Sequence, residues 1–190
     1  MTDPTLFGAP WDHRLTALTA VTSTLLLAGT AVPLWVALTR VPSGVLRVLL
    51  LCGGVIPFAA FVFGILLAPR GYTIADGRLT INRFVCPVEI PLASIQAIEI
   101  LPADRLAGSW RTLGSEGFFG YYGRFRNQAL GSYRMYATRG EGFVLVRAVH
   151  PYVLTPDSPE RFVETLGRGC GEAGPGKLPP RAGDPKGGDA

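Results

Sequence analysis

The N-terminal third of the chain is dominated by two long stretches without a charged side chain. Residues 15–38 and 48–68 contain no Asp, Glu, Lys or Arg. Each is at least as long as the run of about 20 apolar residues that a helix needs to cross a bilayer core. The short segment 39–47 separates them, so the pattern predicts an antiparallel transmembrane hairpin with both of its ends on the same side.

Small and hydroxylated residues interrupt both stretches. Gly53 and Gly54 thin the second helix, and small residues are typical of faces where membrane helices approach closely. In the first helix, hydroxyl groups recur near one face, at Thr16, Thr19, Ser23 and Thr30. These groups either hydrogen-bond to other helices or bond to carbonyls of the preceding turn in their own helix.

After residue 70 the hydrophobic positions alternate with a period of two and are punctuated by turn signals. Asp76-Gly77 between two alternating runs is a strong hairpin signal. About seven strands are expected between residues 72 and 166. The segment Asp157–Glu160 then predicts a helix start, with a capping residue followed by Pro. The predicted helix ends at Gly167.

The pattern therefore divides the chain into four parts. Residues 1–14 form a polar lead, whose Phe7 and Trp11 are expected in the membrane interface. Residues 15–68 form the hairpin, and residues 70–167 a domain large enough for its own core. The Gly- and Pro-rich segment 168–190 is expected to be disordered.

Composition agrees with a membrane protein in a reducing compartment. Hydrophobic residues make up 48% of the chain, and the net charge is +4. Cys52, Cys86 and Cys170 lie far apart, which excludes the spacing of a metal site and argues against a disulfide framework. A cleaved signal peptide is the rival interpretation of the first span, but that span is longer than a typical signal core and a second span follows directly.

The distribution of arginine predicts the orientation. Arg40 and Arg47 lie in the loop between the spans, whereas four arginines flank the opposite side, namely Arg14, Arg70, Arg78 and Arg83. Positive charge concentrates on the cytoplasmic side of membrane proteins. The chain is therefore expected in the inner membrane as a multi-pass protein with its domain in the cytoplasm.

Several segments of the domain resemble the bacterial pleckstrin-homology-like (PH-like) family, in the version that follows N-terminal transmembrane helices. The matching segments are YTIADGRLTINR, IPLASIQAIEIL, GSEGFFGYYGRF, GSYRMYATR, GFVLVRA and YVLTPDSPERFVETL, and together they cover residues 70–167. The resemblance implies an α+β fold, with a roughly seven-stranded antiparallel barrel capped by a C-terminal helix. The resemblance places the chain among proteins that mostly lack any assigned activity.

One feature departs from the PH domains that bind phosphoinositides. Those domains carry a basic cluster in the loop between their first two strands, whereas this chain has only Asp76-Gly77, followed by Arg78. Recognition of inositol phosphates is therefore not carried over, and fold alone does not establish function.

Aromatic and basic side chains concentrate between residues 105 and 139. Aromatic rings that remain exposed suit contacts with lipid headgroups or a protein partner. Arginines outnumber acids here, and each can add about 1 kcal/mol of attraction to an anionic membrane surface. The candidate binding residues are Trp110, Arg111, Phe118, Phe119, Arg124 and Arg126. The alternative interpretations are that the aromatic rings belong mainly to the core and that the arginines form a solvated face.

Glycine recurs every third residue at Gly114, Gly117, Gly120 and Gly123, without the Lys-Ser or Lys-Thr of a phosphate loop. These glycines are expected to permit bends, bulges or close backbone approach. His13 and His150 have no neighbouring Cys or carboxylate at ligand spacing. We therefore predict no catalytic residues, no metal and no cofactor, and no nucleic-acid partner, since no nucleic-acid recognition motif is present.

Two functions remain as hypotheses. In the first, the chain is a membrane-anchored, non-catalytic PH-like module that binds a protein partner or lipid headgroups at the inner face of the membrane. In the second, it is a subunit of a membrane transport or envelope-assembly complex, and the helices carry the interaction. Homo-oligomerisation is compatible with both.

Overall fold

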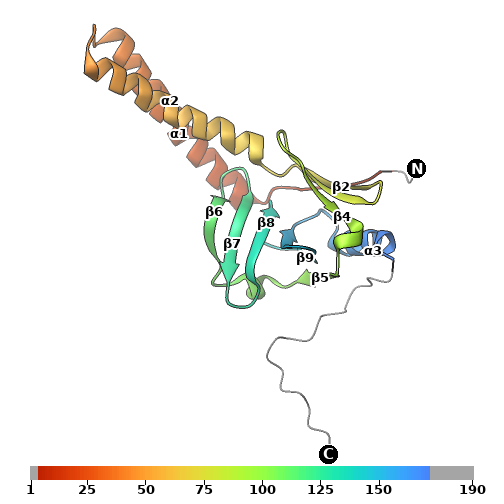
Figure 1. Ribbon diagram of the computed structural model, residues 1–190. Helices are drawn as coiled ribbons and strands as arrows, with labels where there is room; N and C mark the ends of the chain where they lie inside the picture. The colour runs from red at the N-terminus through yellow and green to blue at the C-terminus, as the bar shows by residue number, and fades with distance from the viewer. Residues whose placement is uncertain (1–3, 172–190) are drawn as a thin grey trace, which may run out of the picture.

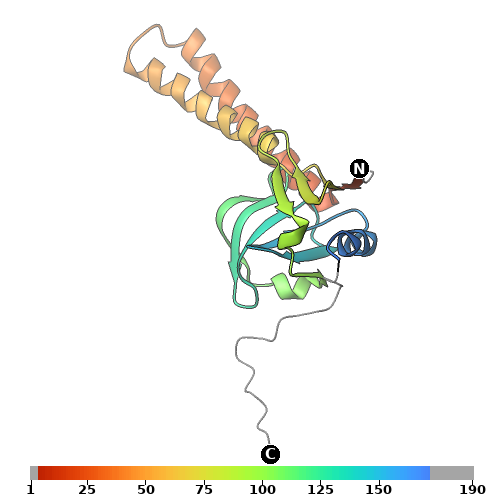
Figure 2. The ribbon, with the colours of Figure 1, turned by 45° about the vertical axis from the view of Figure 1, so that its right-hand side comes forward.

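Two long helices project from a small β-rich domain and run side by side away from it (Figures 1 and 2). This computed structural model describes residues 4–171. The predicted tail, residues 168–190, begins inside the last helix, and residues 172–190 lie outside the described residues.

The helices are α1 (His13–Thr39) and α2 (Val45–Leu67), close to the predicted bounds of 15–38 and 48–68. Asp12 caps α1 by accepting a hydrogen bond from the Leu15 amide at 2.6 Å. Both helices are long and apolar enough to cross a membrane. Little of their surface is buried, which is unlike the core helix of a soluble domain.

The two helices approach closely at one of the two predicted glycines. A Cβ atom on Gly54 would lie 2.8 Å from Cγ of Leu34, whereas one on Gly53 would meet nothing within 4 Å. The glycine pair thus has one member in the helix contact and one on the outer surface.

The first sheet contains four antiparallel strands in the order β1-β2-β3-β4. They are β1 (Thr5–Gly8), β2 (Gly71–Ala75), β3 (Arg78–Asn82) and β4 (Val88–Pro91). The hairpin predicted at Asp76-Gly77 is confirmed, with φ values of 49° and 71° at the two turn residues. A two-residue turn with positive φ at both positions matches the twist of the flanking strands.

The N-terminal lead is not a free polar segment, because it supplies strand β1. Phe7 pairs with Tyr72 across the strands and is buried, with its ring centroid 5.0 Å from that of Phe162. The expectation that Phe7 lies in the membrane interface was wrong. A strand of four residues is too short to be recognised locally, and it forms because β2 offers an open edge.

The second sheet contains six strands in the order β5-β9-β10-β8-β7-β6. They are β5 (Ala97–Leu101), β6 (Trp110–Glu116), β7 (Tyr121–Asn127), β8 (Gly131–Ala137), β9 (Phe143–Arg147) and β10 (Pro151–Leu154). Two short 3₁₀ segments, Leu92–Ser94 and Ala103–Leu106, flank β5.

The predicted seven-stranded antiparallel barrel is corrected in two respects. The strands form two open sheets, and β10 pairs with β8 in parallel. Strand β10 inserts between β8 and β9, so neighbours in the sheet are not neighbours in the sequence. Strand β9 lies between β5 and β10, and its apolar run Phe143–Val146 suits that interior position, because a strand covered on both faces does not alternate.

Helix α3 (Pro159–Gly169) closes the domain and packs Phe162 and Leu166 into the core. Pro159 occupies its first turn as predicted, but Asp157 does not cap the helix, because the N-cap position is Ser158. The Asp157 carboxylate instead accepts a hydrogen bond from the Gly8 amide at 3.2 Å and so ties α3 to β1.

The buried Tyr72 hydroxyl links the two sheets. It donates to the Tyr136 carbonyl at 2.6 Å and accepts from the Thr155 amide at 3.1 Å. Burial raises the pKa of Tyr72 to about 12, because ionisation would leave a charge in the core.

Phe7→Ala should destabilise the domain by about 3–5 kcal/mol, since it removes a buried ring from the contact with Phe162. Leu6→Ala is the matched control, because Leu6 is 71% exposed on the same strand. It should change stability by less than about 0.5 kcal/mol. Denaturant unfolding of the full chain in detergent micelles measures both, and equal midpoints would contradict the role of β1.

Tyr72→Phe should cost about 1–3 kcal/mol at pH 8, because the Thr155 amide and the Tyr136 carbonyl lose their partner. Because the pKa of Tyr72 is raised, its neutral hydroxyl contributes fully to the free energy of unfolding below pH 10, the ordinary pKa of tyrosine. This contribution is then lost as pH rises to about 12, by about 3 kcal/mol in total. The stability gap between wild type and variant should therefore narrow between pH 10 and pH 12. A gap that stays constant in pH-dependent unfolding would show that Tyr72 ionises freely.

Candidate functional site

Strands β6 and β7 form a hairpin whose backbones approach unusually closely. Gly114 and Gly123 face each other, with φ values of 124° and 129°. A Cβ atom on Gly114 would lie 2.0 Å from the Tyr122 carbonyl oxygen, and the register shifts between Arg111 and Leu113. The structural interpretation of the spaced glycines is confirmed at this pair, where the strands have no room for a side chain.

The turn of this hairpin, residues 117–120, lies against the domain-side ends of both helices (Figure 1). The Phe119 ring centroid is 5.9 Å from that of Phe61 in α2 and 5.8 Å from that of Trp11. The Phe119 amide donates to the Thr19 hydroxyl of α1 at 3.1 Å, and Phe118 packs 6.4 Å from Phe61. We call this contact between the turn and the helices the joint.

Gly64 in α2 allows the joint to close. A Cβ atom there would lie 2.3 Å from Cε1 of Phe118. The Tyr122 hydroxyl donates to the Gly64 carbonyl at 3.2 Å, and burial raises the pKa of Tyr122. A methyl group in place of a hydrogen atom on the Gly64 Cα would therefore displace the Phe118 ring, which packs between α2 and the turn.

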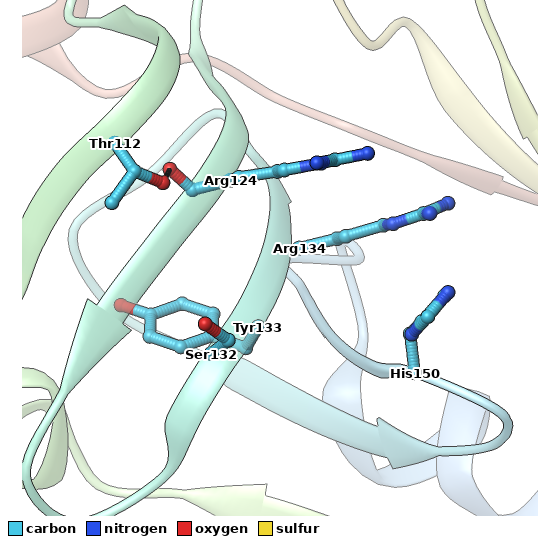
Figure 3. Close-up of a pocket in the computed structure, with 6 residues that line it drawn as sticks. All are labelled: Thr112, Arg124, Ser132, Tyr133, Arg134 and His150. Atoms are coloured by element: carbon cyan, nitrogen blue, oxygen red, sulfur yellow. Dashed lines mark hydrogen bonds between the residues drawn. The ribbon is translucent and has the colours of Figure 1, made fainter.

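Below the joint, arginines line one face of the second sheet. Arg124 on β7 and Arg134 on β8 stand directly opposite each other in the register. Their side chains extend in the same direction beside a cavity of about 340 Å³ (Figure 3). The cavity is lined by Thr112, Arg124, Ser132, Tyr133, Arg134 and His150.

A second cavity of about 330 Å³ shares both arginines and extends towards the helices. Leu67, the last residue of α2, lines it together with Arg83 and Tyr136. The guanidinium carbon of Arg83 lies 5.5 Å from the centroid of the Tyr136 ring, and that of Arg134 lies 5.8 Å from the centroid of the Tyr152 ring. Of the three arginines that line this cavity, Arg83 and Arg134 are thus held against aromatic rings, and Arg124 is the third.

The structure separates the six predicted site residues into three groups. Trp110 and Arg126 face each other on β6 and β7, and strand alternation puts Arg124 on the same face. Arg111 opposes Phe125, so it lies on the opposite face of the hairpin. Phe118 and Phe119 lie in the joint.

Sequence reasoning missed other members of this face. Arg134 falls within the arginine-rich segment 105–139, but its position opposite Arg124 depends on the pairing of β7 with β8. Arg83 and His150 come from segments more than 20 residues away on either side of the hairpin, and no spacing rule connects them to it. Among the described residues, no group of three or more His, Cys, Asp or Glu side chains could hold a metal ion.

The domain thus consists of two open β-sheets and a C-terminal helix that packs into its core. The family model described as "Bacterial PH domain" matches residues 70–169, which is more than half of the chain. The chain therefore belongs to the bacterial PH domain family, as the sequence resemblance implied. No curated protein and no solved structure matches it.

Gly64→Ala should open the joint while leaving α2 intact, because Ala is a better helix former than Gly by about 1 kcal/mol. We expect faster hydrogen exchange at the Phe119 amide in chains reconstituted into nanodiscs. Gly53→Ala is the control, since nothing lies within 4 Å of its Cβ position. Unchanged protection of Phe119 in Gly64→Ala would mean that the turn does not depend on this contact.

Proposed function

We propose that this protein is a membrane-anchored, non-catalytic binding module. It holds a protein partner or lipid headgroups against the inner face of the membrane, with its PH-like domain in the cytoplasm. The observation that carries the proposal is the joint, because it orients a face rich in arginine relative to two helices that are suited to a bilayer.

The dimensions of the helices support an anchor role. At 1.5 Å per residue α1 is about 40 Å long and α2 about 35 Å, against a hydrocarbon core of about 30 Å. Counted from Val48, the first residue after the charged Arg47, about 20 residues of α2 fill that core, which puts its boundary near Leu67. The joint at Gly64 then lies within one helical turn of the boundary.

A second contact suits the same boundary. The loop between β3 and β4 rises beside the lower end of α2 (Figure 1), where the Val85 amide donates to the Leu66 carbonyl at 3.2 Å. Phe84 and Val85 are exposed, and the Arg70 guanidinium lies 4.0 Å from the Phe84 ring centroid. Exposed apolar side chains beside a cation are typical of the interface.

The depth of each residue below this boundary suggests what it meets. Tyr122 contacts Gly64, and Arg124 follows two positions later, up to about 7 Å further from the membrane. That is within a headgroup layer of about 5–8 Å. Arg126 and Trp110 are up to about 13 Å away. We therefore assign Arg124 to headgroups, Trp110, Arg111 and Arg126 to a protein partner, and Phe118 and Phe119 to the joint.

The alternative, in which the helices bind other subunits, is weakened at three of the four hydroxyls that suggested it. The hydroxyls of Thr16 and Thr30 donate to the carbonyls of Asp12 and Leu26 within α1. The hydroxyl of Thr19 accepts from the domain. These groups are therefore not needed for contacts with another subunit, which favours the domain as the binding part.

A photocrosslinking amino acid at position 110 tests the proposal in intact cells. Trp110 is 53% exposed on the face that we assign to a partner, so we expect a discrete adduct in the membrane fraction. The control is position 128, because Gln128 is exposed in the β7–β8 turn, at the far end of the hairpin from the helices (Figure 2).

Equal labelling at the two positions would indicate random collisions and contradict a binding face near Trp110. A chain that stays in the supernatant after lysis without detergent would contradict the anchor.

A further inference from the structure

We propose that Arg124 and Arg134 form a binding site for a phosphate group, completed by Arg83 on its membrane side. This inference rests on the proposed function and names the ligand chemistry of its lipid-facing part. The site lies on strands β7 and β8, away from the Asp76-Gly77 turn.

The pairing of the two arginines is the first argument. Like charges directly opposite each other on neighbouring strands are destabilising. Arg124 and Arg134 nevertheless face each other in register, and their side chains run parallel rather than diverging (Figure 3). An anion between them would turn this repulsion into two attractive contacts.

Ion pairing within the chain does not account for the arrangement. Across the side chains that the structure describes, the arginines paired with carboxylates are Arg78, Arg147 and Arg168. Arg134 donates to the Tyr152 hydroxyl at 3.4 Å, a long hydrogen bond that uses one of its five donors. The two guanidinium groups thus retain donors for an external acceptor.

Arg83 adds a third cation from the first sheet. Its side chain is held over Tyr136 and donates to the Cys86 carbonyl. Its Nε atom is buried and has no hydrogen-bond partner among the described residues. A buried unpaired donor costs about 1–3 kcal/mol, so the described residues leave one polar group of Arg83 unsatisfied in a side chain that lines this cavity.

The shape and place of the two cavities suggest the size and source of the ligand. Each has a volume above 300 Å³, which is ample for a phosphate group with part of its substituent. Guanidinium groups bind phosphate oxygens through paired, charge-assisted hydrogen bonds. Leu67 at the end of α2 and the exposed Leu113 line the membrane-side cavity, so apolar atoms of the ligand would meet apolar atoms there. A phospholipid fits these contacts better than free phosphate.

Calorimetric titration of the full chain in phosphatidylcholine nanodiscs tests the site with two probes. Dioctanoyl phosphatidic acid presents a phosphate group attached to a lipid, and inorganic phosphate presents the phosphate without the lipid. We expect the lipid to bind about tenfold tighter or more, which corresponds to about 1.4 kcal/mol from the additional apolar contacts. Equal affinity would support the phosphate site and assign it to a soluble ligand, whereas binding of neither probe would overturn it.

Matched variants separate the site from general positive charge. Arg124→Gln or Arg134→Gln should weaken binding about tenfold or more, as expected for a lost charge-assisted hydrogen bond. Arg161→Gln removes the same charge from an exposed position on α3, outside the lining of both cavities, and should change affinity less than about twofold. Equal losses in Arg124→Gln and Arg161→Gln would overturn the site.

Arg124→Lys guards against misfolding, since it keeps the charge but not the planar fork, and it should lose part of the affinity. Protection of the Phe119 amide reports that each variant is folded. A chain that gives the expected adduct at position 110 but binds neither probe would lose the phosphate site and retain the proposed function.

Discussion

The packing of the β6–β7 turn against the helices is the contact on which the rest of the structure depends. At Gly64 the absence of a side chain lets the Phe118 ring lie against the backbone of α2. The Phe119 amide and the Tyr122 hydroxyl then satisfy polar groups of α1 and α2. Aromatic packing and two hydrogen bonds together set the direction in which the second sheet leaves the helices.

A second tie holds the opposite edge of the domain. The chain enters α1 from β1, which is already part of the first sheet. Asp12 caps α1 and also accepts a hydrogen bond from the Gly140 amide of the domain at 2.9 Å. Because the segments before and after the helical hairpin both belong to one domain, the hairpin is an insertion into that domain. Its two ends must lie on the same side of a membrane.

These ties fix the position of the arginine face relative to the two helices. A flexible linker would let the domain rotate, and its charges would then interact with the membrane only on average. With the joint closed, Arg124 and Arg134 lie about two strand positions from the helix boundary, and Trp110 and Arg126 lie further away. One face can thus present a zone for headgroups and a zone for a partner, which is the division that we propose.

The local pattern of residues determined much of this description. Two uncharged runs indicated the helices, Asp76-Gly77 indicated a hairpin, and the order of motifs indicated a bacterial PH domain. The helices and the hairpin depend on composition and on periodicity within short windows, which a sequence displays directly, whereas the family follows from the resemblance of whole motifs. The glycines of the β6–β7 hairpin also belong here, since an absent side chain at a regular spacing indicates a close backbone approach.

The tertiary structure alone decided how distant segments meet. The lead became strand β1 because β2 had an unpaired edge, and β10 was inserted between β8 and β9. Of the predicted site residues, Phe118 and Phe119 were drawn into the joint, whereas Arg124 gained Arg134 and Arg83 as neighbours. Strand order and register depend on contacts between residues far apart in the chain, and a shift by one residue would reverse which side chains share a face. No local pattern contains that information, so the site could be anticipated by its kind of residue but not by its members.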